Sequence, residues 1–325
     1  MVFRTEIDIK DNIPLISHDS SILTLGSCFA TEIGSVLEKR LYDILVNPTG
    51  PLYNPISIEN IINHVVARKS YLSSDLVRNS DGGLFHSLYH HSVFSNEDAN
   101  KVLDKINRTN DLILSYLRKD NLVVIITLGS ARAFRLKSDK RVVANCHKLP
   151  FNLFETIDIE TDEITTVLNK IISNIRSINY DSKIIFTVSP IRHKSYGLHN
   201  DKLSKAKLLI AVDRAIKEGE NLFYFPSYEI MMDDLRDYRF YAQDMLHPND
   251  TAIEYIYGKF EEAYIDDKEK VLGKDCLALF KRVTHRPIIG SKNDSFNNKT
   301  EEIASEIFSK YPKIQDALRR LKRDE

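Results

Sequence analysis

The chain contains, at residues 21–37, the stretch SILTLGSCFATEIGSVL. Its first five residues form a short, mostly apolar run that ends at Gly26, which is typical of a buried strand. Beyond Gly26, apolar side chains recur at the spacing of one helix face, at Phe29, Ile33, Val36, Leu37 and Leu41. The stretch therefore predicts a strand, a tight turn at Gly26-Ser27-Cys28 and a helix that begins at once.

Further along the chain, the same alternation of strand and helix is repeated. Short apolar runs occur at residues 42–46, 122–128, 183–188 and 221–225. The run at 122–128, LVVIITL, is the most apolar, so we expect it to be the central strand. Helical patterns occupy residues 164–175, 203–216 and 253–264. This order predicts an α/β fold, a three-layer α/β/α sandwich with a mostly parallel five-stranded sheet.

Two regions do not follow the alternation. Residues 51–120 are expected to form a loop-rich cap insertion, and residues 266–325 a helical appendage to a main domain of residues 1–265. The apolar spacing of the appendage breaks near Pro312. Its basic end at 319–323 suits a solvated helix terminus, with a partner-binding tail as the alternative.

The bulk composition excludes several classes of protein. With 325 residues, 28% charged residues and a net charge of −1, nothing demands nucleic acid or a membrane surface as a partner. The N-terminus is charged where a signal peptide needs an apolar core, so we expect a soluble cytoplasmic protein. The three cysteines form no CxxC pair, which disfavours a structural zinc site. The sequence also contains no GxGxxG motif, which disfavours a nucleotide cofactor. We therefore expect neither a metal nor a cofactor.

The turn at Gly26-Ser27-Cys28 is the first candidate for chemistry. A nucleophile there would project from the carboxyl edge of the sheet, where open α/β folds bind ligands. It would also sit at a helix N-terminus, whose dipole favours a thiolate and a developing oxyanion. The alternative is a structural turn with a buried cysteine.

The second candidate is Asp244-Met245-Leu246-His247-Pro248, after the last predicted strand. An aspartate three residues before a histidine can hold one ring nitrogen, which leaves the other nitrogen to face a nucleophile. Asp244 would then fix the tautomer of His247, and His247 would act as general base and later as acid.

Taken together, these motifs resemble the GSCFA family, named for the five residues 26–30, which is similar to a branch of the SGNH (GDSL) hydrolase superfamily. The resemblance covers roughly residues 5–265. It also includes residues 47–55 (NPTGPLYNP), 127–129 (TLG), 143–148 (VANCHK), 188–190 (VSP) and 244–248. It implies a flavodoxin-like layout and an enzyme that forms an acyl-enzyme on an acylated carbohydrate.

The roles that the resemblance implies leave the nucleophile open. The first block of the superfamily is Gly-Asp-Ser, and laying it without gaps on residues 26–28 makes Cys28 the nucleophile. The alternative is that Ser27 attacks and Cys28 belongs to the core; we favour Cys28. The resemblance also implies oxyanion donors from the backbone N–H groups of Cys28 and Gly50.

One position departs from the superfamily pattern. The third block is Gly-x-Asn, but Ala131 stands where the asparagine would be. Loss of such a donor costs about 3 kcal/mol in other enzymes. Another group must replace it, or the activity is weak or altered. Asn145, Ser130 and Asn47 are candidates, and of these Asn145 is our predicted oxyanion donor.

Substrate contacts are expected from Asn47, Asn54, His90, His147 and His193, and Arg192 could hold an anionic part of a substrate. The histidines at 86, 90 and 91 are interpreted as a polar cap, not as a metal site. The predicted partner is a small-molecule or glycan acyl ester. Three functions remain open: an esterase, an acyltransferase that modifies a polysaccharide or glycan precursor, and a non-catalytic binding protein on the same scaffold.

Overall fold

The computed structural model describes residues 4–9, 13–79, 83–217, 219–284 and 294–324. Its centre is a five-stranded sheet in the order β10-β9-β5-β1-β2, and every neighbouring pair is parallel. The strands are β1 (Ser21–Gly26), β2 (Asp43–Val46), β5 (Leu122–Leu128), β9 (Lys183–Val188) and β10 (Leu222–Phe225). The five predicted strands and the α/β fold class are thus confirmed.

The strands at the centre of the sheet are apolar because helices cover both of their faces. All residues of β1 and β5 are buried. The two strands pair from Ser21 opposite Leu122 to Gly26 opposite Thr127. A strand buried on both faces is continuously apolar instead of alternating, which is why LVVIITL marks the centre.

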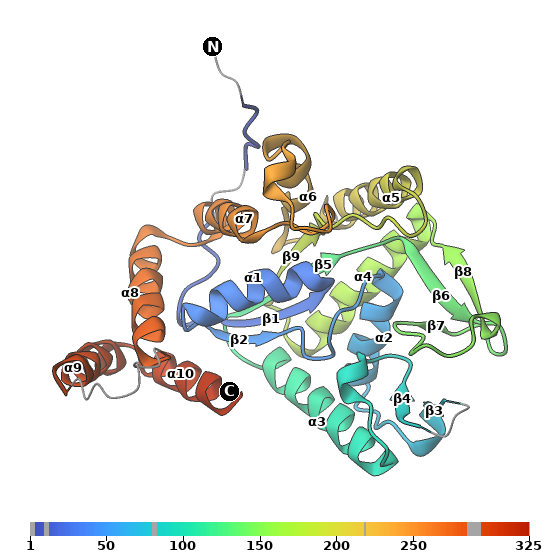
Figure 1. Cartoon of the computed structure of the whole chain (residues 1–325), viewed down its shortest axis with the longest axis horizontal. Coiled ribbons are helices and arrows are strands. Elements are labelled where there is room, and N and C mark those ends of the chain that lie inside the picture. Colours follow the sequence, from blue (N-terminus) through green and yellow to red (C-terminus); the bar gives the residue numbers. More distant parts are fainter. Residues whose placement is uncertain (1–3, 10–12, 80–82, 218, 285–293, 325) are drawn as a thin grey trace.

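Two helical layers enclose this sheet, so the three-layer sandwich is confirmed (Figure 1). One face packs against α2 (Pro55–Val66), α3 (Ala99–Leu117), α4 (Thr161–Ile178) and α5 (Leu198–Lys217). The other face packs against α1 (Cys28–Lys39), α7 (Asp250–Tyr264) and the helical turn Ile230–Asp234, which follows the short helix α6 (Ser227–Glu229).

The segment 51–120 differs from the loop-rich cap that we expected. Its helices α2 and α3 belong to the sheet-covering layer, and Ile58, Ile61 and Ile62 of α2 are completely buried in the main core. The irregular part is limited to residues between these helices. It contains the single turns Ser73–Asp75 and Ser92–Phe94 and the hairpin of β3 (Leu76–Arg78) with β4 (Phe85–Ser87).

A second, antiparallel sheet follows β5 and was not predicted. It has the order β7-β6-β8 and consists of β6 (Arg132–Leu136), β7 (Val142–Val143) and β8 (Phe154–Asp158), with the turn Phe151–Leu153 before β8. It forms a wall beside the carboxyl edge of the main sheet.

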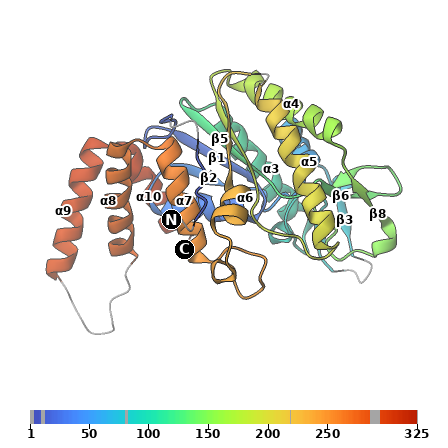
Figure 2. The same cartoon turned by 90° about the horizontal axis from the view of Figure 1, so that it is seen from above.

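The C-terminal helices are α8 (Asp267–Val283), α9 (Asp294–Lys310) and α10 (Pro312–Asp324). Figures 1 and 2 place them together at the end of the molecule opposite the small β6–β8 sheet. Pro312 begins α10, so the expected break lies where the sequence put it. Arg320 is not a solvated end: its guanidinium donates to Asp43 at the start of β2, 2.6 Å away.

No helix in the described ranges combines the length and the apolar character that crossing a bilayer requires. Nor do three or more His, Cys, Asp or Glu side chains among these residues converge in a way that could hold a metal ion.

Candidate active site

A cavity of about 620 Å³ opens at the carboxyl edge of the main sheet. Its walls come from the segments that follow β1, β2, β5 and β9 and from the loop before α7. The lining includes Ser27, Cys28, Tyr53, His193 and His247. Both predicted centres of chemistry, the turn at residue 28 and the histidine at 247, therefore face one cavity, where open α/β sheets bind their ligands.

The turn that carries Cys28 is held rigidly. Gly26 has φ of +133°, and a Cβ atom there would lie 2.1 Å from the carbonyl oxygen of Thr127 on β5. Only glycine fits this approach. The backbone N–H of Ser27 donates to the same oxygen over 3.0 Å, and helix α1 begins at Cys28.

Asn47 holds this turn by hydrogen bonds and does not face the cavity. Its side chain accepts from the N–H of Gly26 at 3.1 Å and donates to the carbonyls of Gly26 and Ser27 at 3.0 and 3.2 Å. Asn47 is buried and does not line the cavity. The structure thus makes it a support of the turn, which corrects the expected substrate contact.

The environments of Ser27 and Cys28 differ sharply. Ser27 is 1% exposed, and its hydroxyl oxygen is shielded from solvent and has no hydrogen-bond partner among the described residues. Cys28 is half-buried, and its Sγ lies 3.1 Å from the hydroxyl of Tyr53. A nucleophile needs access to its substrate, so this geometry favours the thiol.

Tyr53 is a site residue that the sequence interpretation missed. Its carbonyl accepts from the N–H groups of Gly129 and Ser130, both at 2.8 Å, which fixes its backbone against the end of β5. Burial, followed by the hydrogen bond with Cys28, raises the pKa of the Tyr53 phenol, so it stays protonated and able to donate. Its place in the NPTGPLYNP motif, directly after the second strand, was the available signal.

His247 and Asp244 form the predicted pair. The Nδ1 atom of His247 lies 2.5 Å from one carboxylate oxygen of Asp244, and the other oxygen accepts from the backbone N–H groups of Leu246 and His247. These backbone hydrogen bonds, together with the one to the His247 ring, lower the pKa of Asp244 to about 2. The carboxylate is therefore ionised at neutral pH and leaves Nε2 as the free nitrogen of His247.

Arg192 and His193 follow β9 and line the same cavity as Cys28 and His247. Arg192 donates to the carbonyl of Met245 at 2.8 Å and stacks on Tyr241, which anchors the loop that carries His247. His193 meets the ring of Tyr53 edge-on, with centroids 5.7 Å apart. Burial, with smaller effects of Lys205 and His247, lowers the pKa of His193 to about 4, so its imidazole is neutral at physiological pH.

Gly50 cannot serve as the predicted oxyanion donor. Its N–H donates to the carbonyl of Asn47 at 2.8 Å within the turn, and its Cα faces the side chain of His91. Ala131 is 2% exposed in the main core and does not line the cavity, so position 131 has no part in the site. Cys28 is the first residue of α1, and the side chain of Ser27 makes no capping hydrogen bond to this helix. The geometry thus leaves the N–H of Cys28, the Tyr53 hydroxyl and the predicted side-chain amide of Asn145, which lines the cavity, as candidate donors.

The other predicted residues divide between cavity and core. Asn54, Asn145 and His147 line the cavity, although Asn54 also caps α2 through Ser57 and His147 bonds the carbonyl of Ser87. Asn145 accepts from the N–H of His147 at 2.9 Å. His90 is 1% exposed and is bonded to Ser87, away from the cavity lining, which corrects its predicted contact with substrate.

A buried lysine ties the site to the sheet. Lys205 of α5 is 1% exposed and donates to the carbonyls of Gly129 and Ser189, each at 2.8 Å. These carbonyls follow the ends of β5 and β9, so one ammonium fixes two loops of the cavity. Burial lowers the pKa of Lys205 to about 8. Its position on a helix face gave no sequence signal for this role.

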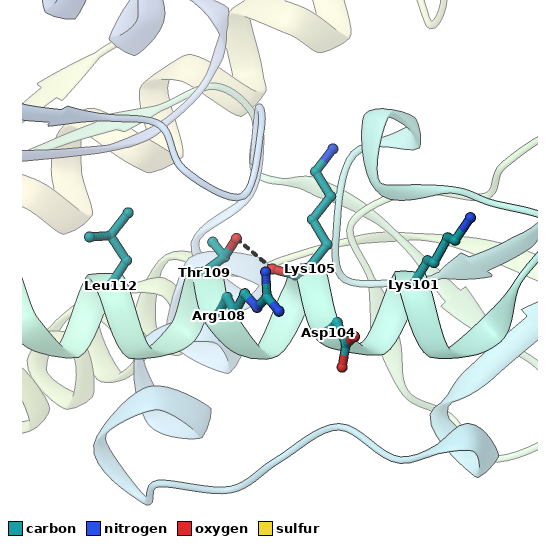
Figure 3. Close-up of a pocket in the computed structure, with 6 residues that line it drawn as sticks. All are labelled: Lys101, Asp104, Lys105, Arg108, Thr109 and Leu112. Carbon is teal, nitrogen blue, oxygen red and sulfur yellow. Dashed lines mark hydrogen bonds between the residues drawn. The ribbon is translucent and has the colours of Figure 1, made fainter. Parts of the chain in front are cut away.

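A second pocket lies along α3, and the residues that line it differ in kind from those that line the cavity beside Cys28. Figure 3 shows Lys101, Lys105 and Arg108 projecting from this single helix beside Asp104. It contains neither a thiol nor a histidine. We therefore place the candidate active site at the carboxyl edge of the sheet.

A family model matches residues 21–260. This span includes the turn at residues 26–28, the pair of Asp244 and His247, and all five parallel strands. The chain belongs to the GSCFA family. Among solved structures, this GSCFA protein is similar to a carbohydrate esterase family 3 protein from Talaromyces cellulolyticus. The two share 12% sequence identity over 79% of this chain and 99% of that chain, with a TM-score of 0.34. No curated protein sequence matches the chain.

Proposed function

We propose that this GSCFA protein is an acyl-ester hydrolase that works through a thioester on Cys28. The observation that carries the proposal is the accessible Cys28 thiol, which shares one cavity with a histidine oriented by an ionised aspartate. A thiol, a base and an orienting carboxylate are the parts that nucleophilic acyl transfer needs. The family resemblance adds an acylated carbohydrate as the expected substrate class.

The first half of the reaction forms the acyl-enzyme. Nε2 of His247 takes the thiol proton while Sγ of Cys28 attacks the ester carbonyl carbon. The charge that develops on the carbonyl oxygen is stabilised by the N–H of Cys28 and the hydroxyl of Tyr53. The intermediate collapses to a thioester, and the departing alcohol takes its proton from the imidazolium of His247.

The second half returns the free enzyme. His247 removes a proton from water, which attacks the thioester, and the thiolate of Cys28 leaves and regains that proton. If a sugar hydroxyl replaces water, the same groups perform acyl transfer. The two outcomes share every residue of the site, so the acceptor decides between them.

Intact-mass analysis after mixing with 4-nitrophenyl acetate tests the proposal. We expect one acetyl group on Cys28 in the wild type, none in Cys28→Ala, and formation at least about 100-fold slower in His247→Ala. Ser27→Ala is the matched control at the neighbouring position and should acylate like the wild type.

Two other outcomes would contradict the proposal. An acetyl group on Ser27 would transfer the role of nucleophile to the serine. No His247-dependent adduct on either residue would leave a binding protein on a hydrolase scaffold, the remaining alternative.

A further inference from the structure

The cavity wall carries an unbalanced charge. Arg132, Lys148, Arg192 and Lys194 line it, whereas no aspartate or glutamate is among its lining residues. The whole chain is nearly neutral, with 45 Lys and Arg against 46 Asp and Glu. The excess of cations is therefore a property of this wall and not of the overall composition.

Two of the three histidines that line the cavity do not change this balance, and the third, His247, is paired with Asp244. Burial lowers the pKa values of His147 and His193 below the ordinary value of imidazole, so both rings are neutral at physiological pH. The positive charge thus comes from the four lysine and arginine side chains.

The protein itself leaves most of this charge uncompensated. Arg132 lies 3.4 Å from Asp158, a carboxylate outside the lining with a 60% exposed side chain. Arg192 bonds only a backbone carbonyl, and Asp201, which acts on it electrostatically, lies behind the wall. Among the described residues, no ion pair involves Lys148, Lys194 or Arg192.

Apolar surface accompanies the cations. Phe134, Val143, Phe151 and Ile191 line the same cavity, and Phe151 is 70% exposed. A concave site with one sign of charge and apolar walls focuses its electric field and concentrates ligands of the opposite charge. Arginine is suited to holding carboxylates and phosphates because its N–H groups match their paired oxygens.

We propose that the substrate of this site is an acyl ester that also carries an anionic group, a carboxylate or a phosphate, held by Arg132, Lys148, Arg192 and Lys194. This inference rests on the proposed function, because it assigns the part of the ester that the cysteine does not attack. The neutral acyl group meets Cys28, and the anionic part of the alcohol contacts the basic wall. Carboxylate and phosphate share this chemistry, and the test distinguishes them.

Three aryl acetates with the same acetyl group provide the test. They carry a neutral amide, a carboxylate or a phosphate opposite the ester: 4-acetoxybenzamide, 4-acetoxybenzoate and 4-acetoxyphenyl phosphate. Each kcat/KM is divided by the rate of uncatalysed hydrolysis, which removes differences between the leaving groups. We expect at least one anionic ester to exceed the amide by about tenfold, the size of one charge-assisted hydrogen bond. Added salt should reduce this preference.

The double variant Lys148→Gln/Lys194→Gln tests the wall itself. Both lysines are exposed, so the substitutions should not affect folding. The preference for the anionic ester should fall several-fold in this variant. Lys101→Gln removes an exposed cation from α3, outside the cavity, and should keep the preference of the wild type.

The inference and the proposed function fail in different ways. If Cys28 is acetylated but the three esters react equally, or the amide reacts best, the anionic substrate is overturned and the thioester mechanism stands. If no ester acetylates Cys28, binding of the alcohol products decides the inference without chemistry. In titrations followed by NMR, 4-hydroxybenzoate or 4-hydroxyphenyl phosphate should bind more tightly than 4-hydroxybenzamide, and equal binding would overturn the inference.

Discussion

At the scale of single residues, the site depends on which groups have access to the cavity. The thiol of Cys28 reaches it, whereas the hydroxyl of Ser27 is shielded from solvent. Cys146 also lines the cavity, but burial raises the pKa of its thiol to about 11, so it is protonated at neutral pH. These differences single out one of the two cysteines at the cavity.

Ser27→Ala should leave both activity and stability intact. The hydroxyl of Ser27 is buried without a partner, and such a group contributes no hydrogen bond to lose on removal. We expect an unchanged acetylation rate and a urea midpoint equal to or above that of the wild type. A loss of acetylation with retained folding would show that Ser27 takes part in the chemistry.

Tyr53→Phe should slow acylation because it removes the hydroxyl beside Sγ. Loss of one oxyanion donor lowers the rate by about 100-fold in well-studied enzymes. Alkylation of Cys28 by iodoacetamide develops no oxyanion, so its rate should change little. The comparison of acetylation with alkylation in one variant therefore identifies the role of Tyr53. If both rates fell equally, the hydroxyl would act on the thiolate and not on the oxyanion.

At the scale of elements, the sequence predicted those parts whose patterns are local. The strand runs and the Gly26 turn are visible in the sequence because burial on both faces demands apolar residues and close approach demands glycine. The pair Asp244 and His247 was also visible, since its members are only three positions apart.

Other elements could not be predicted because their roles depend on distant contacts. Tyr53 meets Cys28 only through the fold, and Lys205 reaches two loops from a helix face. The small β6–β8 sheet pairs strands across an irregular segment, and only one of the five residues of β6 is buried. Gly50 was assigned to the oxyanion from a motif, but its N–H closes a turn.

The buried Lys205 predicts a specific dependence of stability on pH. Its pKa is about 8 in the folded protein, below the ordinary value of 10.5. Between these values the unfolded chain binds more protons than the folded one, so this group makes stability rise as the pH increases from 8 to 10.5. Lys205→Met should lose that rise. Urea midpoints at pH 7.5, 9 and 10 measure it.

Other groups titrate in the same pH range, so the test compares the pH dependence of stability in the wild type with that in the variants. Lys202→Met, an exposed position on the same helix, should keep the slope of the wild type. Parallel slopes for wild type and Lys205→Met would show that the Lys205 ammonium is not desolvated by the fold.

At the scale of the whole molecule, Asp43 joins the appendage to the catalytic layers. Its carboxylate accepts from Ser21 of β1, from Tyr116 of α3, from Lys119 and from Arg320 of α10. The pocket lies at the carboxyl edge of the sheet, whereas Asp43 starts β2 at the opposite edge. The appendage is thus attached away from the candidate active site, and we expect it to contribute to stability.

Asp43→Asn should destabilise the fold in a manner that depends on pH. Burial alone would raise the pKa of Asp43, but the hydrogen bond from Lys119 and the charge of Arg320 outweigh it and lower the pKa to about 2. Because the unfolded value is higher, the carboxylate contributes about 2 kcal/mol above pH 4. This contribution is lost as the pH falls from about 4 to 2. Urea midpoints of wild type and variant should therefore differ at pH 7 and converge near pH 2.

Hydrogen exchange in the same variant locates the effect. Since Arg320 loses an ionic partner, amides of α10 should exchange faster in Asp43→Asn, whereas those of β5 should change only with global stability. Asp104→Asn, an exposed position on α3, should alter neither region. If α10 and β5 shifted together, the appendage and the sheet would unfold as one cooperative unit; a selective shift in α10 would instead make α8–α10 a separately opening subdomain. A constant difference between the urea midpoints down to pH 2 would contradict the ionic role of Asp43 itself.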